Sequence, residues 1–258
     1  MKTYYTFLDE YGFADPKTFS KDPYFIVTAV LYNSKTKDII INNLNTLKIN
    51  YFGKKSYILH RSELYKDLKS NHISYSAFAD DLEKTLYCKF IVFQTIVKKK
   101  DVFYLNWTTK TVYKNVYRDL FGNITKYSIA KDVNNIVLAE ASSVNQDIEI
   151  YKNFFHYIAN GISTLNISHT DVKQHLTSLN FVIKINNDAG EQLADLFSKS
   201  GKHKYLSDIG VSKSEDLDYL DSLLLNILKK RLFSYPLNCK NKRKILIYPT
   251  IQSFRNFP

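Results

Sequence analysis

The chain has 258 residues, of which 45% are hydrophobic and 24% are charged. This length predicts one large domain or two small ones with a substantial core, and the composition excludes a disordered chain. The sequence has no apolar run of about 18 residues that would span a membrane and no basic leader followed by an apolar stretch. We therefore expect a soluble, cytoplasmic protein without a membrane partner.

The first half of the chain begins with strands. Residues 3–9 and 24–32 are apolar and aromatic, and turn-forming Gly, Pro and Asp residues separate them, which predicts an antiparallel pair. The other elements expected in this half are a helix at 36–50, a short strand at 56–60, an amphipathic helix at 74–86 and a strong strand at 87–97.

Helices and strands alternate in the second half. The predicted elements are a helix at 111–121, a strand at 135–140, a helix at 146–160, a strand at 178–185, a helix at 189–199, a long helix at 216–233 and an edge strand at 244–250. This order predicts an α/β domain with a mixed sheet flanked by helices. The turn-rich segment 200–215 is the best candidate for a boundary, between a core domain at 1–205 and a basic helical C-terminal extension at 206–258 packed on it.

The positive charge is concentrated near the C-terminus. The formal net charge is +11, and residues 222–258 contain eight basic and no acidic residues. Such a segment suits a polyanion, because each neutralised phosphate releases counterions. The candidate nucleic-acid-binding residues are Lys240, Lys242, Arg243 and Lys244. The alternative is an ordinary solvated face of a lysine-rich protein. The sequence does not indicate the oligomeric state.

Three acidic residues stand out by their positions. Asp9 ends the first predicted strand, and Glu140 ends the strand "NIVLAE". Asp195 lies in "DAGEQLADLF", where Asp188, Gln192 and Asp195 follow i, i+4, i+7 spacing and share one face of a helix.

Converging carboxylates favour a metal site over a purely structural role. Hard divalent cations such as Mg²⁺ prefer carboxylate oxygens, and two such ions can clamp the attacking and leaving oxygens of a phosphodiester. Without a cation the acids would repel one another. The pattern therefore predicts a site for Mg²⁺ or Mn²⁺ with Asp9, Glu140 and Asp195 as catalytic metal ligands and Asp188 as a further candidate ligand.

Four short motifs resemble one family of bacterial and phage proteins, the domain of unknown function 3800 family. "FLDEYG" resembles the family's "DESG" opening, and "ILHRSEL" (58–64) resembles its His-x-x-acid element. "IVLAEAS" (136–142) lies where the family has an acid at a strand end, and "EQLADLF" (191–197) is similar to its Gln-x-Ala-Asp helix. The motifs occur in the expected order and cover residues 4–200.

The resemblance implies a ribonuclease H-like fold with a metal-dependent nuclease site. It implies that Asp9 is the central bridging ligand and that Glu140 and Asp195 complete the cluster. Two residues depart from the family pattern: Tyr11 replaces the usual Ser, and Glu140 stands where Asp is common. The auxiliary residues that the motifs suggest are Glu10, His60, Glu63 and Gln192.

Several of these residues have other interpretations. Asp188 and Glu191 also form an Asp-x-x-Glu pair typical of a helix N-cap. His60 could be a general acid or base, a phosphate contact or a core histidine, and Gln192 could orient a carboxylate or bind a substrate backbone.

Two functions therefore remain open. One is a divalent-metal-dependent nuclease, with a role in phage or mobile-element defence or counter-defence. The other is a non-catalytic module of the same fold that holds a nucleic acid, a nucleotide or a partner protein.

Overall fold

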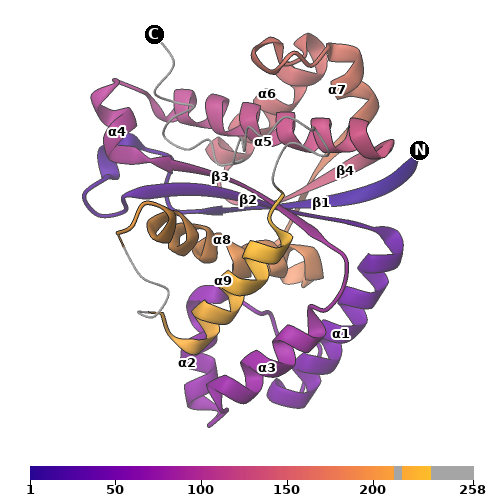
Figure 1. Ribbon diagram of the computed structural model, residues 1–258, viewed down its shortest axis with the longest axis vertical. Helices are drawn as coiled ribbons and strands as arrows, with labels where there is room; N and C mark the ends of the chain where they lie inside the picture. The colour runs from indigo at the N-terminus through magenta and orange to yellow at the C-terminus, as the bar shows by residue number, and fades with distance from the viewer. Residues whose placement is uncertain (212–216, 234–258) are drawn as a thin grey trace.

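A five-stranded sheet forms the centre of the part of the protein that the structure describes. The computed structural model describes residues 1–211 and 217–233 and shows a mixed α/β architecture with helices on both faces of the sheet (Figure 1). The strands are β1 (Lys2–Tyr11), β2 (Tyr24–Asn33), β3 (Ile91–Lys98), β4 (Val133–Glu140) and β5 (Leu176–Val182).

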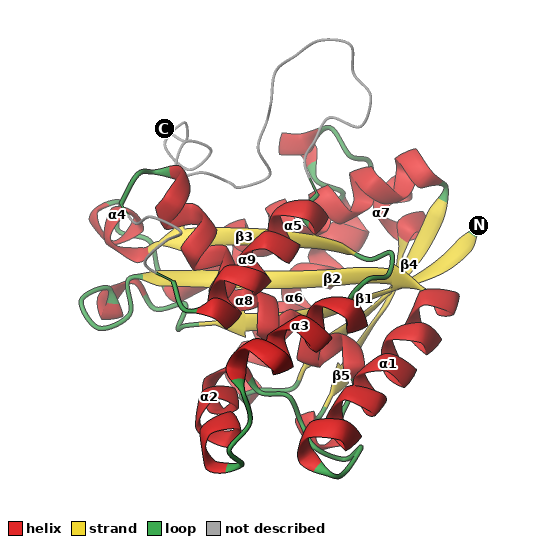
Figure 2. Ribbon diagram, turned by 60° about the horizontal axis from the view of Figure 1, so that its bottom comes forward, coloured by secondary structure: helices red, strands yellow, loops and turns green. Residues whose placement is uncertain are grey.

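The strand order is β3-β2-β1-β4-β5 (Figure 2). Strand β2 pairs antiparallel with β1 and β3, whereas β4 runs parallel to both β1 and β5. Only β2 therefore runs against the other strands of this sheet. The carboxyl ends of β1, β4 and β5 consequently lie at the same edge of the sheet.

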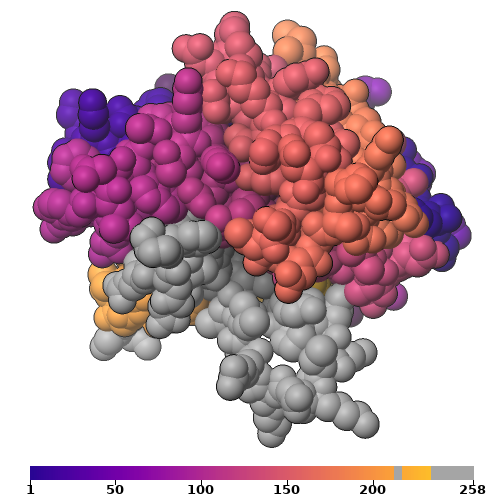
Figure 3. Space-filling model, turned by 90° about the horizontal axis from the view of Figure 1, so that it is seen from above, coloured from indigo at the N-terminus to yellow at the C-terminus, as the bar shows by residue number. Residues whose placement is uncertain are grey.

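Two layers of helices cover the sheet. One layer contains α4 (Lys99–Tyr104), α5 (Thr109–Lys131), α6 (Val144–Asn160) and α7 (His169–His175), and Figure 3 looks onto this layer. The other contains α1 (Ser34–Phe52), α2 (Arg61–Ser70), α3 (Tyr75–Thr85), α8 (Ala189–Asp208) and α9 (Tyr219–Arg231). Within the described residues, no helix has the length and apolarity needed to cross a membrane.

Alternation along the strands divides the core in two. Leu8 packs in the cluster beneath α5 and α6, whereas Phe7 packs in the cluster with α1, α3 and α8. Successive strand side chains point to opposite faces, so Asp9 continues the Phe7 face and Glu10 continues the Leu8 face. This alternation decides which helices each acid meets.

Most elements that the sequence predicts are present, including the antiparallel pairing of β1 with β2. The predicted strand at 56–60 is wrong, because these residues form an irregular segment before α2. The turn-rich interpretation of 200–208 is also wrong, because α8 continues to Asp208, so the predicted domain boundary at 205/206 falls inside a helix. The predicted edge strand at 244–250 lies outside the described residues.

The long C-terminal helix that the sequence predicts is α9. Its residues Leu220, Leu224 and Leu228 are buried in the same cluster as residues of α3 and α8. Residues 219–231 thus form part of the domain core.

Candidate functional site

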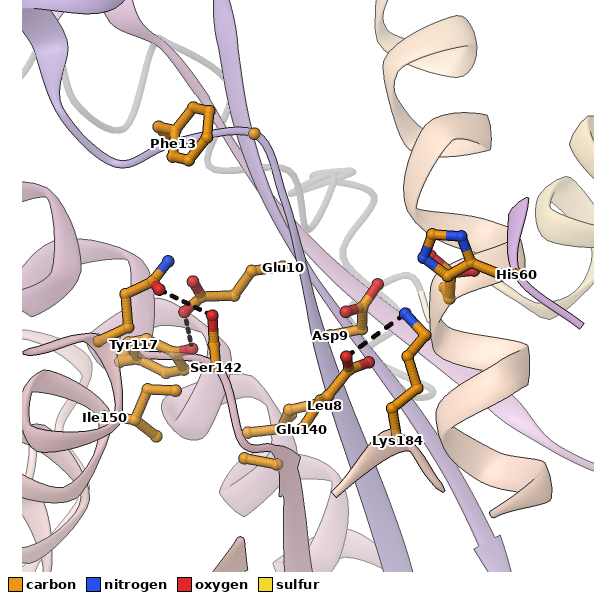
Figure 4. A pocket seen from close by; sticks show the side chains of 14 residues that line it. Leu8, Asp9, Glu10, Phe13, His60, Tyr117, Glu140, Ser142, Ile150 and Lys184 are labelled. Atoms are coloured by element: carbon orange, nitrogen blue, oxygen red, sulfur yellow. Dashed lines mark hydrogen bonds and ion pairs between the residues drawn. The ribbon is translucent and has the colours of Figure 1, made fainter. Parts of the chain in front are cut away.

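A cavity of about 320 Å³ opens where β1 and β4 separate. The parallel pairing of these strands ends at Leu8 and Ala139. Beyond this point β1 continues along β2, while β4 ends and the chain enters α6. Crevices at the carboxyl ends of strands, where neighbouring connections diverge, are the usual ligand sites of open α/β sheets. The cavity wraps over the end of β1, so it has an Asp9 side and a Glu10 side (Figure 4).

The Asp9 side brings together the three acids that the sequence singles out. Asp9, Glu140 and Asp195 all line the cavity, and they come from β1, β4 and α8. Lys184, which follows β5, places its Nζ 3.4 Å from Oε1 of Glu140. Figure 4 shows the Asp9 and Glu140 carboxylates and the Lys184 side chain converging on this side.

The acids on this side are electrostatically coupled. Burial raises the pKa of Asp9 well above its usual range, and repulsion by Asp195 and Glu140 raises it further. Attraction by Lys184 and a hydrogen bond from Ser198 oppose this rise. One lysine thus only partly compensates three carboxylates, an arrangement that costs stability in the absence of a cation.

Helix α8 reaches this side because a glycine lets it approach the sheet. A Cβ on Gly190 would lie 2.2 Å from the Phe7 ring, so only glycine allows this contact. Asp188 caps the helix by accepting a hydrogen bond from the Gly190 N–H. Two turns on, Ser198 Oγ donates to Oδ2 of Asp9 over 3.2 Å. The close contact therefore fixes α8, and Asp195 with it, against the end of β1.

Gln192 and Asp195 hold the segment that carries His60. The Leu59 N–H donates to Oε1 of Gln192 over 2.9 Å, and the Arg61 N–H donates to Oδ2 of Asp195 over 2.6 Å. His60 lies between them and lines the cavity, with its Nδ1 2.6 Å from Oγ of Ser62. Gln192 thus positions a loop, and its amide nitrogen donates to backbone oxygens before α8.

The Glu10 side has a different chemistry. The hydroxyl groups of Tyr117 and Tyr113 donate to Oε1 and Oε2 of Glu10 over 2.6 and 3.1 Å. Burial raises the pKa of Glu10 to about 7, against the effect of these hydrogen bonds. Ser142 and Gln146, around the start of α6, also line the cavity. Glu10 therefore does not join the Asp9 cluster.

The remaining predicted residues differ in their placement. Asp188 is the N-cap of α8 and also lines a small adjoining cavity with Glu140 and Asp195. Glu63 is exposed in the first turn of α2 and is not among the residues lining the main cavity. The four basic residues of 240–244 lie outside the described residues.

Sequence reasoning missed two charged residues of this region, Lys184 and Glu191. No local pattern marks Lys184, although an acid cluster requires a compensating cation. The sequence pattern predicts only a helix-cap role for Glu191, yet its side chain is buried and its Oε1 has no hydrogen-bond partner.

The donor set suits a hard cation. Carboxylate oxygens are the preferred ligands of Mg²⁺ and Mn²⁺, and Asp9, Glu140 and Asp195 supply them on one wall. In residues 1–211 and 217–233, no three His, Cys, Asp or Glu side chains form a ready-made metal-binding group. In this conformation Lys184 neutralises Glu140, so binding of a cation would require the lysine to move away from Glu140.

Comparison of the chain with protein-family models, with curated proteins and with solved structures found no match in any of the three. The resemblance to the domain of unknown function 3800 family therefore stays a prediction.

Glu191 predicts a specific pH dependence of stability. Burial, with repulsion by Asp188 and Glu140, raises its pKa to about 8, above the value of 4.5 expected in the unfolded chain. The folded state therefore holds a proton that the unfolded state releases between these values, and stability falls as pH rises. Between pH 5 and pH 7 the loss from Glu191 is roughly 2.5 kcal/mol. Chemical denaturation should show that Glu191→Gln reduces this slope, while the part that Glu10 contributes remains.

The exposed Glu63 provides the control, because Glu63→Gln should leave the slope unchanged. An unaltered slope in Glu191→Gln would show that Glu191 is ionised in the folded protein at neutral pH.

Proposed function

We propose that this protein is a divalent-metal-dependent nuclease of ribonuclease H-like fold that hydrolyses phosphodiester bonds in nucleic acid. The observation that carries the proposal is the convergence of Asp9, Glu140 and Asp195, from two adjacent parallel strands and one helix, in a single open cavity. A mixed five-stranded sheet in which only the second strand runs against the others supports the fold assignment. The resemblance of the four sequence motifs supports it independently.

The residues around Asp9 could bind the metal, contact the phosphate and transfer a proton. Asp9, Glu140 and Asp195 would hold Mg²⁺ or Mn²⁺, which supplies a nucleophilic water at neutral pH and stabilises the charge of the phosphoryl group. Lys184, released from Glu140, provides a positive charge for a phosphate oxygen. Ser62 contacts Nδ1 of His60, which leaves Nε2 for a phosphate contact or a proton transfer to the leaving oxygen.

The first test is a calorimetric titration with Mn²⁺, with and without a single-stranded oligonucleotide. The wild type should bind Mn²⁺. Asp9→Ala should lose this binding, because Asp9 is the acid that interacts electrostatically with both Asp195 and Glu140. Glu63→Ala, which changes an exposed acid outside the cavity, should bind as the wild type does.

Equal binding by Asp9→Ala would exclude the proposed metal site. No binding by the wild type in either condition would leave the non-catalytic binding module as the better explanation of the cavity.

A further inference from the structure

The Glu10 side of the cavity has the composition of a nucleobase-binding site. It contains an exposed aromatic ring, a carboxylate held in one orientation, and a fixed amide, all next to the Asp9 cluster. None of these groups contributes to the proposed metal chemistry, so their arrangement calls for a separate explanation.

Phe13 is the aromatic group. It lines the cavity, and 67% of its surface is exposed. The Phe13 N–H donates to Oδ2 of Asp22 over 2.9 Å. The preceding Gly12 has a φ of +81°, and a Cβ there would lie 2.5 Å from the Tyr24 carbonyl oxygen. The turn therefore holds Phe13 at the rim of the cavity (Figure 4), where its face can stack on a planar ligand.

Glu10 is the carboxylate. Each of its two oxygens accepts one hydrogen bond from a tyrosine hydroxyl. A carboxylate has about four lone-pair sites, so one acceptor site on each oxygen is left for a ligand in the cavity. Two parallel acceptors in a plane match two adjacent N–H donors, which is the geometry of bidentate recognition.

Gln146 is the amide. Its Oε1 accepts hydrogen bonds of 2.7 Å from the hydroxyl groups of both Ser142 and Ser143, and these contacts hold the amide in place. The Nε2 group lies beside the Tyr113 hydroxyl, and its second N–H remains available to donate. This side of the cavity thus presents two acceptors and one donor.

Among the standard bases, guanine carries the matching edge. Its N1–H and N2–H groups are adjacent donors, and its O6 is an acceptor beside them, whereas adenine and cytosine offer a single exocyclic amino group. We propose that Glu10, Gln146 and Phe13 form a guanine-binding subsite that receives the base of a nucleotide whose phosphate lies on the Asp9 side. The physiological role of this subsite rests on the proposed nuclease function, but base binding itself does not require the metal.

The test is a titration of the full-length protein with nucleosides in EDTA at pH 8, followed by NMR. Guanosine should bind at least about fivefold more tightly than adenosine or cytidine, the smallest discrimination expected of a bidentate base contact. Inosine, which lacks the N2 amino group, should bind with intermediate affinity. Glu10→Gln should abolish the preference for guanosine, because an amide nitrogen would face the two donors.

Two further variants separate the roles. Phe13→Ala should weaken the binding of every nucleoside by about fivefold or more, as expected for loss of a stacking platform. Because Phe13 is exposed, this substitution should not disturb folding. Tyr87→Ala, which removes another exposed aromatic ring, should change nothing. Equal affinities of the wild type for guanosine and adenosine would overturn the subsite, as would an unchanged preference in Glu10→Gln.

The subsite and the nuclease function can fail separately. Guanosine preference without metal-dependent cleavage of oligonucleotides would retain the subsite and refute the nuclease. Metal-dependent cleavage without any base preference in binding would retain the nuclease and refute the subsite.

Discussion

Asp195→Asn should reduce metal-dependent cleavage of an oligonucleotide by at least about 100-fold, because even residues that only orient metal ligands cost up to this factor. The substitution is nearly isosteric. The asparagine oxygen can still accept the Arg61 N–H that Asp195 accepts over 2.6 Å, so the His60 segment keeps its position. The loss therefore reports the missing carboxylate charge rather than a displaced loop.

Asp9→Asn should lower cleavage but raise the stability of the folded protein. Burial and the neighbouring acids raise the pKa of Asp9 well above its usual range, so ionising this group costs more free energy in the folded state than in the unfolded state. Replacing this carboxyl group by an amide should increase the free energy of unfolding in EDTA, because the folded state then holds one acid fewer beside Asp195 and Glu140, while cleavage falls as in Asp195→Asn. Such a trade between activity and stability is expected at a functional site and not at a structural one.

Cleavage rates and denaturation curves for both variants, with Glu63→Gln as the exposed control, would check this pair of effects. A variant with wild-type cleavage would remove that residue from the metal site. A fall in stability of Asp9→Asn in EDTA would mean that the Asp9 carboxylate supports the fold, against the electrostatic argument.

The position of the acids could be predicted because strand ends leave a local signature. Asp9 and Glu140 each follow an apolar run, and the carboxyl ends of parallel neighbours must meet at one edge. The i, i+7 relation of Asp188 and Asp195 similarly needs only helical geometry. The positions of these four acids can therefore be predicted from the sequence alone. All of them line the main cavity or the small cavity next to it.

The errors occur where distant residues decide the local structure. The segment 56–60 has a strand-like composition, yet the Leu59 N–H is satisfied by the side chain of Gln192, far along the chain, and not by a neighbouring strand. Helix α8 continues past residue 199 because its later turns remain packed, with Tyr205 buried against Tyr24 and Ile96. Propensity is a weak prior that tertiary contacts override.

The sequence predicts only part of the division of the cavity into an Asp9 side and a Glu10 side. Strand alternation predicts that Glu10 points away from Asp9, and it does. That Tyr113 and Tyr117 of α5 would receive Glu10, or that Lys184 would meet Glu140, depends on how separate elements pack. No spacing along the chain encodes those contacts.

The second large effect concerns stability, and its source lies next to the His60 segment. Asp221 of α9 forms a buried ion pair with Arg61 at the start of α2. It also accepts a hydrogen bond of 2.9 Å from Lys199 and lies 3.5 Å from Nε2 of His203, both on α8. One carboxylate therefore ties three helices together. Asp221→Ala should lower the free energy of unfolding by about 3–5 kcal/mol, because it leaves a buried arginine without its partner.

Asp208→Ala is the matched control, because Asp208 pairs with Lys204 on the same helix at an exposed position. Such pairs contribute about 0–1 kcal/mol, so chemical denaturation should separate the two variants clearly. Comparable losses in both would show that burial does not strengthen the Asp221 cluster.

The pH dependence and a double variant test the cause of this effect. Burial opposes ionisation of Asp221, but its contacts with His203, Lys199 and Arg61 outweigh it and hold the pKa of Asp221 well below its usual range. Its contribution is therefore complete above the pKa of an unfolded aspartate and is lost as pH falls below it. Arg61→Met combined with Asp221→Leu should recover much of the stability that Asp221→Ala loses, because apolar replacement of both partners removes the unpaired charge. If the double variant is no more stable than Asp221→Ala, the cost arises from packing of α9 and not from an orphaned buried charge.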